Sequence, residues 1–282
     1  MVAQRFRQPR VAEIVASKLR DDILSGRLKE GDVLPSQESL FGEFGVSPPA
    51  LREAIHILET DGLISVRRGN VGGAVVHQPT AERTAHMISM VLQARSATPV
   101  DVSAALMHLE PICAGMCAAR EDRMIEVVPY LQHEIDIQTA RFDDVSQYVP
   151  NARRFHETLV ARCGNEPMIL LIGSLELIWS AHESSVWKDD DEPAPMVDKT
   201  RRAALRDHQR LLDAIGDGNP AKAVRLAQDH LAVARRNTLA FGVDKTIEAK
   251  LMSDIGPRLD VRFRNNGRPQ SRKESGNDWL GH

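Results

Sequence analysis

Apolar residues recur at helical spacing near the start of the chain. Residues 11–25 form the first such segment, and Gly26 ends it, because glycine commonly closes a helix. Four apolar positions, each four residues from the next, mark its inward face: Val11, Val15, Leu19 and Ile23. We therefore predict an amphipathic helix here.

Two shorter helices follow this one. Ser36 can cap the first by accepting a backbone N–H bond, and Gly45-Val46 turns the chain at its end. Ser47 can cap the second, which has two prolines in its first turn, where a missing N–H costs little, and stops at Gly62. Its inward face carries Leu51, Ile55 and Leu58.

A basic hairpin completes this part of the chain. Residues 63–66 and 74–76 are apolar enough to be strands, and Arg67-Arg68-Gly69-Asn70 stands at the bend between them. Three helices and such a hairpin predict a winged helix-turn-helix, whose last helix places its first residues at base edges in a major groove. The alternative is an ordinary helix pair with an exposed charged hairpin.

The predicted DNA contacts lie at the helix starts and in the wing. Arg52, one turn into the last helix, can reach a base or a phosphate, and Arg67 and Arg68 can neutralise phosphate charge. Gly69 lets the backbone of the wing approach closely. The whole predicted set is Ser36, Gln37, Ser47, Ala50, Arg52, Arg67, Arg68 and Gly69.

Helical periodicity continues over the next 160 residues, and almost nothing there has the pattern of a strand. The predicted helices are 81–95, 100–120, 124–141, 145–162, 167–186, 196–216 and 220–241. A mainly α protein is expected, with a winged helix-turn-helix at residues 1–78 and an all-helical bundle at residues 79–242. The acidic stretch 188–195 is expected to be a solvated loop, and residues 243–282 a disordered basic tail.

Charge and cysteine content refine this picture. The net charge is −3, and residues 1–78 hold ten basic and ten acidic residues, so DNA affinity must come from a local patch. No apolar run approaches the roughly 20 residues of a membrane span, and the N-terminus lacks the apolar stretch of a secretory signal. Three cysteines, an odd number, favour a reducing cytoplasm without a disulfide framework.

The first part of the chain resembles the GntR family of bacterial transcription regulators. The resemblance is carried by Leu34-Pro35-Ser36, Val46-Ser47, Leu51-Arg52-Glu53-Ala54, Leu58-Glu59 and Asp61-Gly62-Leu63-Ile64. Two positions depart from the family, because Glu38 and Pro48 stand where relatives usually have arginines that touch the operator. The resemblance then implies that Arg52 and the wing carry more of the DNA contact here.

The helical part is similar to the ligand-binding FCD domain of the FadR-type branch of that family. Its matching residues are Leu109-Glu110-Pro111, Phe155-His156, Gly164-Asn165, Asp207-His208, Ala214-Ile215 and Asp229-His230-Leu231. Relatives often carry an arginine just before the first of these motifs, whereas this chain has Leu106, Met107 and His108. The resemblance therefore implies a less acidic or bulkier ligand, and the pocket candidates are His108, His182 and Asn151.

Three histidines, His156, His208 and His230, lie on three separate predicted helices. Side chains from facing helices can converge inside a bundle, and three neutral imidazoles that leave an open position are a common zinc site. The resemblance implies an aspartate one turn before the first histidine, but Ala152 stands there. Alternatively, each histidine is a satisfied polar group or a surface residue. Cys113 and Cys117, four residues apart, are interpreted as buried small residues rather than half of a metal site.

Together these features predict a cytoplasmic, homodimeric transcription regulator, most simply a repressor, that binds a palindromic double-stranded DNA operator. Its effector is expected to be a small molecule such as an organic or fatty acid, and its candidate cofactor is zinc or another divalent transition metal. No enzyme activity and no membrane contact are expected. Two other classes stay open: a metal-dependent enzyme that uses the three histidines, and a protein-interaction module.

Overall fold

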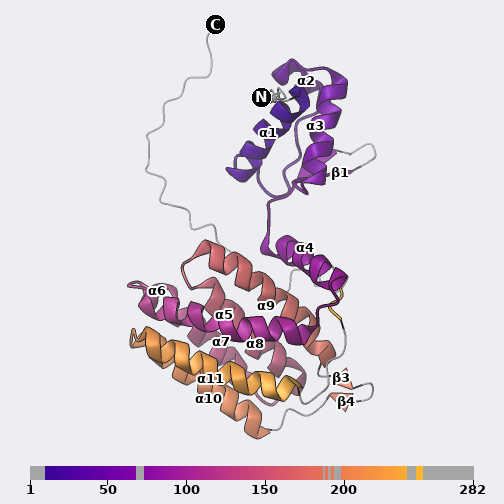
Figure 1. The fold of residues 1–282 in the computed structure, drawn as a ribbon. Helices are drawn as coiled ribbons and strands as arrows, with labels where there is room; N and C mark the ends of the chain where they lie inside the picture. The colour runs from indigo at the N-terminus through magenta and orange to yellow at the C-terminus, as the bar shows by residue number, and fades with distance from the viewer. Residues whose placement is uncertain are drawn as a thin grey trace, which may run out of the picture. The chain divides into compact units, whose positions relative to one another are not determined.

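The computed structural model describes residues 10–67, 73–186, 188–189, 192–193, 198–239 and 246–249. The chain divides into two compact units, residues 1–83 and 84–282. The first contains three helices and an antiparallel hairpin, which confirms the predicted winged helix-turn-helix (Figure 1). Its elements are α1 (Val11–Leu24), α2 (Gln37–Phe44), α3 (Pro48–Thr60), β1 (Ile64–Arg67) and β2 (Gly73–Val76).

The helix ends of this unit follow from local chemistry. The Ser36 hydroxyl accepts a hydrogen bond from the Ser39 amide at 3.2 Å, which confirms the predicted cap of α2. Gly45 ends that helix in the left-handed conformation, at φ 60°. Ser47 stands at the N-cap of α3, but its side chain makes no capping bond, so that part of the prediction is wrong.

A small apolar core joins these elements. Leu51, Ala54 and Leu58 of α3 are fully buried against α1 and the hairpin. Val11 was expected on the inward face of α1, but it is 53% exposed, because a spacing of four residues exceeds one helical turn and Val11 therefore lies to one side of the buried face. The buried face of α1 consists of Ala12, Val15, Ala16, Leu19 and Ile23.

The second unit is a helical bundle in which α5 is the central helix, packed against α8, α9, α10 and α11 (Figure 1). Where α5 meets α11, a Cβ on Gly115 would lie 2.7 Å from Val224 Cγ2, so only glycine permits this close approach. The helices are α4 (Ala81–Ala94), α5 (Pro99–Ala119), α6 (Arg123–Glu126), α7 (Val128–Ala140), α8 (Val145–Ala161), α9 (Glu166–Val186), α10 (Asp198–Gly216) and α11 (Pro220–Leu239).

The predicted elements of this unit need two corrections. The single helix expected at 124–141 is two helices, α6 and α7, separated at Val127. Pro129 explains the break, because a proline ring clashes with the carbonyl four residues earlier in a continuous helix. The stretch predicted as a loop at 188–195 contains two short paired strands, β3 (Lys188–Asp189) and β4 (Glu192–Pro193).

Within the described residues, α5 is the one helix long and apolar enough to cross a membrane by length and composition. Half of that window is buried inside the bundle, and five other helices pack against α5. These are the properties of a core helix, whose apolar character serves packing.

A short segment beyond the last helix also belongs to the core. Residues 246–249, here called the C-terminal strap, pack where α4 ends, and Ile247 is fully buried there. The Ile247 amide donates to the Ala97 carbonyl at 2.9 Å, and the Ala249 amide donates to Gln93 Oε1 at 3.0 Å. The prediction of a disordered tail is wrong for these four residues, while the other tail residues lie outside the described part of the chain.

Candidate functional site

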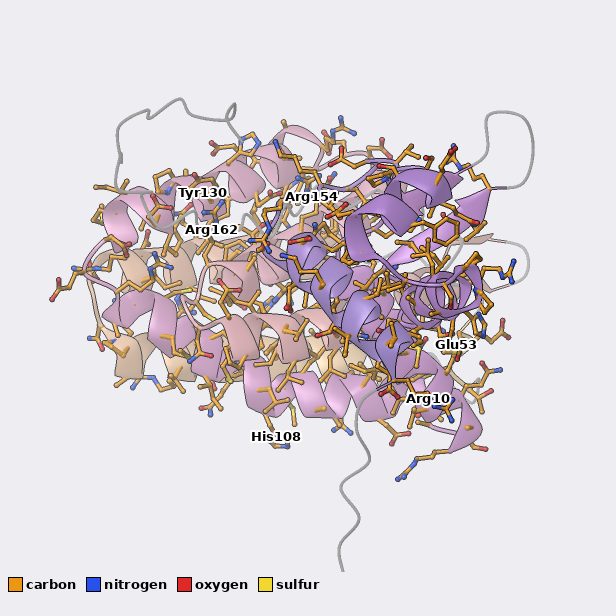
Figure 2. All side chains as sticks on the ribbon, turned by 90° about the horizontal axis from the view of Figure 1, so that it is seen from above. Arg10, Glu53, His108, Tyr130, Arg154 and Arg162 are labelled. Carbon is orange, nitrogen blue, oxygen red and sulfur yellow. The ribbon has the colours of Figure 1, made fainter. Side chains whose placement is uncertain are left out.

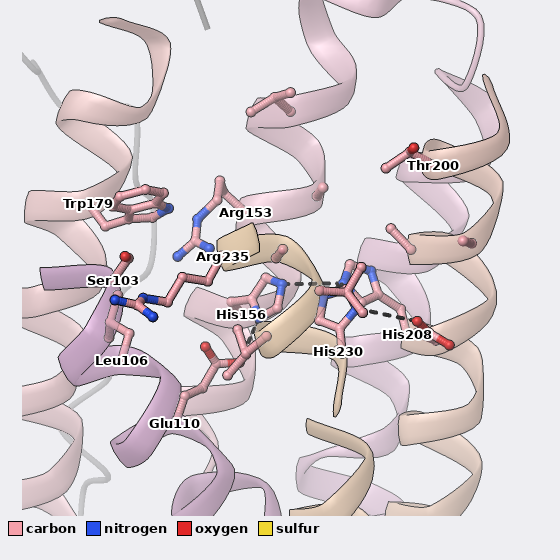
Figure 3. Close-up of a pocket in the computed structure, with 18 of the residues that line it drawn as sticks. Ser103, Leu106, Glu110, Arg153, His156, Trp179, Thr200, His208, His230 and Arg235 are labelled. Atoms are coloured by element: carbon pink, nitrogen blue, oxygen red, sulfur yellow. Dashed lines mark hydrogen bonds and ion pairs between the residues drawn. The ribbon is translucent and has the colours of Figure 1, made fainter. Parts of the chain in front are cut away.

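The bundle brings the three predicted histidines together. His156 projects from α8, His208 from α10 and His230 from α11, and all three are buried (Figure 3). The Nε2 atom of His208 lies 3.3 Å from Nε2 of His156 and 3.2 Å from Nε2 of His230. Three ring nitrogens therefore face a common point, and we call these residues the histidine cluster.

An oxygen atom lies close to the other ring nitrogen of each member. Glu110 Oε1 lies 2.6 Å from Nδ1 of His156, and Gln138 Oε1 lies 3.0 Å from Nδ1 of His208. Asp207 Oδ2 lies 3.7 Å from Nδ1 of His230. The oxygens beside His156 and His208 are at hydrogen-bond distance and can accept the hydrogen on Nδ1, which leaves the lone pair of each Nε2 toward the centre of the cluster.

Burial keeps two members of this cluster, His156 and His208, uncharged. It lowers the pKa of His156 and of His208 well below the ordinary value, and the charge of Arg153 acts in the same direction on both. Burial also raises the pKa of Glu110, against the lowering effect of Arg153. Neutral imidazoles whose lone pairs converge repel one another, so the arrangement suits a cation at its centre.

A cavity of about 300 Å³ opens beside the histidine cluster, between α5, α8, α9, α10 and α11 (Figure 3). One part of its wall is apolar and includes Leu106, Val149 and Trp179. Charged groups stand among these, and Arg153 is held by an ion pair with the buried carboxylate of Glu176. A mostly apolar cavity with a few fixed polar groups is typical of a small-molecule site.

The predicted pocket residues lie elsewhere. His108 is exposed and points outward (Figure 2), and Asn151 is buried but is absent from the described walls of the cavity. His182 is buried on α9, with Nδ1 2.8 Å from the Ile178 carbonyl and Nε2 accepting the Glu248 amide at 2.9 Å. Its ring therefore binds the C-terminal strap through a hydrogen bond. None of these three positions is among the described residues that line the cavity beside the histidine cluster.

Two arginines of the cavity were missed. Arg153 lies three residues before His156 and so shares its helix face, a spacing that could have revealed it. Arg235 lies five residues after His230, and its long side chain brings it to the cavity from a different face of α11. The expectation of a less acidic ligand followed from the missing arginine before Leu109, but other helices supply positive charge instead.

The cysteines form no part of this site. Cys113 and Cys117 are fully buried on α5, and Cys163 is also buried. Burial raises the pKa of the Cys117 thiol, which keeps it protonated and unreactive. This placement agrees with their interpretation as buried small residues.

The candidate DNA-binding residues of the first unit are mostly solvent-accessible. Ser36, Gln37, Ser47, Arg52 and Arg67 are exposed, and Ala50 is half-buried at the start of α3. Arg52 lies on the outer face of α3, away from the buried face of that helix. Arg68 and Gly69 lie outside the described residues. A direct role of these side chains at DNA remains a prediction.

Comparison with known proteins agrees with both units. Residues 11–75 match the sequence model of bacterial regulatory proteins of the gntR family, and residues 101–233 match that of the FCD domain. The chain belongs to the gntR family. The FCD match contains all three members of the histidine cluster.

Relatives of this gntR-family protein include transcriptional repressors. It is 24% identical over 241 residues to the HTH-type transcriptional repressor NanR of Klebsiella aerogenes, with 84% of this chain and 88% of that one covered. It is 26% identical over 239 residues to NanR of Salmonella arizonae, with 83% and 86% covered. A solved GntR structure from Streptococcus agalactiae shares the fold, with a TM-score of 0.60, 19% identity, and coverage of 80% of this chain and 99% of that one.

The two family departures can now be placed on this gntR-family fold. Glu38 lies exposed in the first turn of α2, and Pro48 is the exposed first residue of α3. Each position lies in the first turn of its helix, so the chain presents an acidic and an apolar group where cationic ones were expected from the resemblance. Arg52 is the arginine of α3.

Proposed function

We propose that the protein is a ligand-responsive transcriptional repressor that binds a palindromic operator as a homodimer in the bacterial cytoplasm. The observation that carries this proposal is one chain that holds both a winged helix-turn-helix and a cavity in a separate helical unit. The similarity to transcriptional repressors supports repression rather than activation. One winged helix-turn-helix reads few base pairs, so two copies give useful affinity and specificity.

The DNA contact is assigned to α3 and the wing. Exposed residues at the start of α3 face bases in the major groove, with Arg52 as the main cationic contact, and Arg67 binds the phosphate backbone. Because the unit has no excess of basic residues, affinity depends on these few contacts.

The histidine cluster fits a divalent transition metal, with zinc as the first candidate. The fit rests on three buried imidazoles with converging Nε2 atoms, each of which has an oxygen near Nδ1. The ligands would be His156, His208 and His230. A bound metal supplies an attachment point for an anionic oxygen of the effector at the edge of the cavity.

Regulation follows from population shift. An effector in the cavity favours one arrangement of the dimer, and the operator favours another. Effector binding and operator binding therefore weaken each other. The test combines calorimetric titration of candidate effectors with a gel-shift measurement of operator affinity. If compounds that bind the cavity leave operator affinity unchanged, this coupling is wrong.

A further inference from the structure

One cationic side chain of the cavity has a buried N–H group for which the described residues offer no hydrogen-bond acceptor. Arg235 is half-buried in the cavity wall, and its Nε atom is buried with no hydrogen-bond partner among the described residues. Arg153 differs, because Glu176 neutralises it. A buried N–H without an acceptor costs folding free energy, which a ligand with an acceptor can restore.

The direction of Arg235 separates it from the histidine cluster. In Figure 3 its side chain extends from α11 toward Ser103 and Leu106 of α5, while His208 and His230 lie on the other side of His156. The cavity therefore offers two separate places for an anionic group. One is the histidine cluster, and the other is the guanidinium at the α5 wall.

The cavity wall also has apolar residues that can accommodate a carbon skeleton, beside the ionisable side chains of Glu110 and Arg153. Leu106, Val149, Ala152 and Trp179 are among these apolar residues. A volume of about 300 Å³ is at the lower end of the range for small-molecule sites, roughly 300–1,000 Å³, so the skeleton must be short.

We infer that the cavity binds a small organic acid with two acidic groups, one held by Arg235 at the α5 wall and the other at the histidine cluster. A guanidinium binds a carboxylate through two parallel hydrogen bonds, which gives both strength and direction. The inference rests on the proposed function in one respect, namely that the cluster holds a metal and the cavity receives the effector. It assigns Arg235 as the residue that selects for the second acidic group.

The test uses the full-length, zinc-loaded protein and isothermal calorimetry. The probes are the straight-chain dicarboxylates from succinate to suberate and the monocarboxylates with the same numbers of carbon atoms. At least one dicarboxylate is expected to bind about tenfold or more tightly than its matched monocarboxylate. Arg235→Gln should remove that preference, Arg235→Lys should restore part of it, and Arg236→Gln, a change at the exposed neighbouring residue, should leave it intact.

Three results would overturn the inference: no probe binds the wild type, matched acids bind equally, or Arg235→Gln binds as tightly as the wild type. Circular dichroism and zinc content confirm that each variant is folded and loaded. The calorimetric samples contain no DNA. Their result therefore does not depend on whether effector binding changes operator affinity. Repeating the titrations without zinc shows separately whether the metal assignment fails, because an Arg235-dependent contribution persists in the metal-free protein.

Discussion

The Oε1 atom of Glu110 lies 2.6 Å from Nδ1 of His156, and both side chains are buried in the bundle. This contact fixes the imidazole with Nε2 toward His208, 3.3 Å away. Glu110 thus orients the His156 ring from outside the centre of the histidine cluster, as the oxygens beside metal-binding histidines generally do.

Replacing Glu110 tests this orienting role. Glu110→Leu keeps a similar side-chain volume but removes the acceptor, so zinc affinity should fall about 10- to 100-fold, as for other partners of metal-binding histidines. Competition with a chelating dye measures it. Glu134→Leu is the matched control, because Glu134 is also buried but pairs with Arg154. Unchanged zinc affinity in Glu110→Leu would show that the contact has no orienting effect.

Removing a candidate ligand should have a larger effect. His208→Ala is expected to lower both the zinc content and the Tm of the zinc-supplied protein, because a metal at 100 times its Kd stabilises the folded state by about 2.7 kcal/mol. Elemental analysis and thermal unfolding measure the two quantities. His133→Ala, at an exposed position of α7, should change neither. Wild-type protein that contains no metal after zinc is supplied would contradict the assignment.

Tyr148 predicts a loss of stability at alkaline pH. Its hydroxyl donates to the Arg201 carbonyl at 2.7 Å, and burial raises its pKa to about 12. Between the usual value of 10 and this one, the unfolded chain loses the phenolic proton while the folded protein keeps it. Stability is therefore fully present below pH 10 and decreases as pH rises toward 12, by about 2 kcal/mol at pH 11.5.

Urea unfolding at pH 9 and pH 11.5 measures this loss. Tyr148→Phe should be less stable at pH 9 by about 0.5–1.5 kcal/mol, because it lacks the hydrogen bond, and it should lose about 2 kcal/mol less than wild type on going to pH 11.5. Tyr130→Phe replaces the other tyrosine of the chain, whose side chain is partly exposed, and should lose as much as wild type. Identical losses in all three proteins would refute the role of Tyr148.

A prediction for the DNA-binding unit concerns Arg52. Arg52→Ala should weaken specific operator binding by about 1–3 kcal/mol, because one good base contact of an arginine contributes that much. Gel shifts against specific and random duplexes measure the change. Arg225→Ala removes an exposed arginine of α11 and should leave affinity for both duplexes unchanged. A folded Arg52→Ala protein with wild-type operator affinity would show that α3 docks differently.

The fold was largely predictable because its helices have strong periodicity and clear ends. The boundaries of α1, α5, α8 and α9 agree with the pattern to within one or two residues. The histidine cluster was also predictable, since helices that pack side by side bring residues from distant parts of the sequence together. The fold class and the family are confirmed.

The sequence does not reveal where each side chain points or which group it contacts. Periodicity places His182 on a helix but does not say that its ring receives a backbone amide from the end of the chain. Likewise, the spacing between His230 and Arg235 puts them on different helix faces, and only the length and path of the arginine side chain bring it to the same cavity. The partners of Nδ1 come from α5, α7 and α10, and no local pattern links these residues to the histidines.

The match to the FCD domain stops at residue 233, whereas Ile247 completes the packing where α4 ends. A fragment cut after α11 would expose an apolar hollow and remove the amides that bind Ala97, His182 and Gln93. The folded helical unit thus extends beyond the residues that match the FCD domain. Anyone who isolates the helical half for crystallisation or ligand screening should extend the expressed sequence past Ala249.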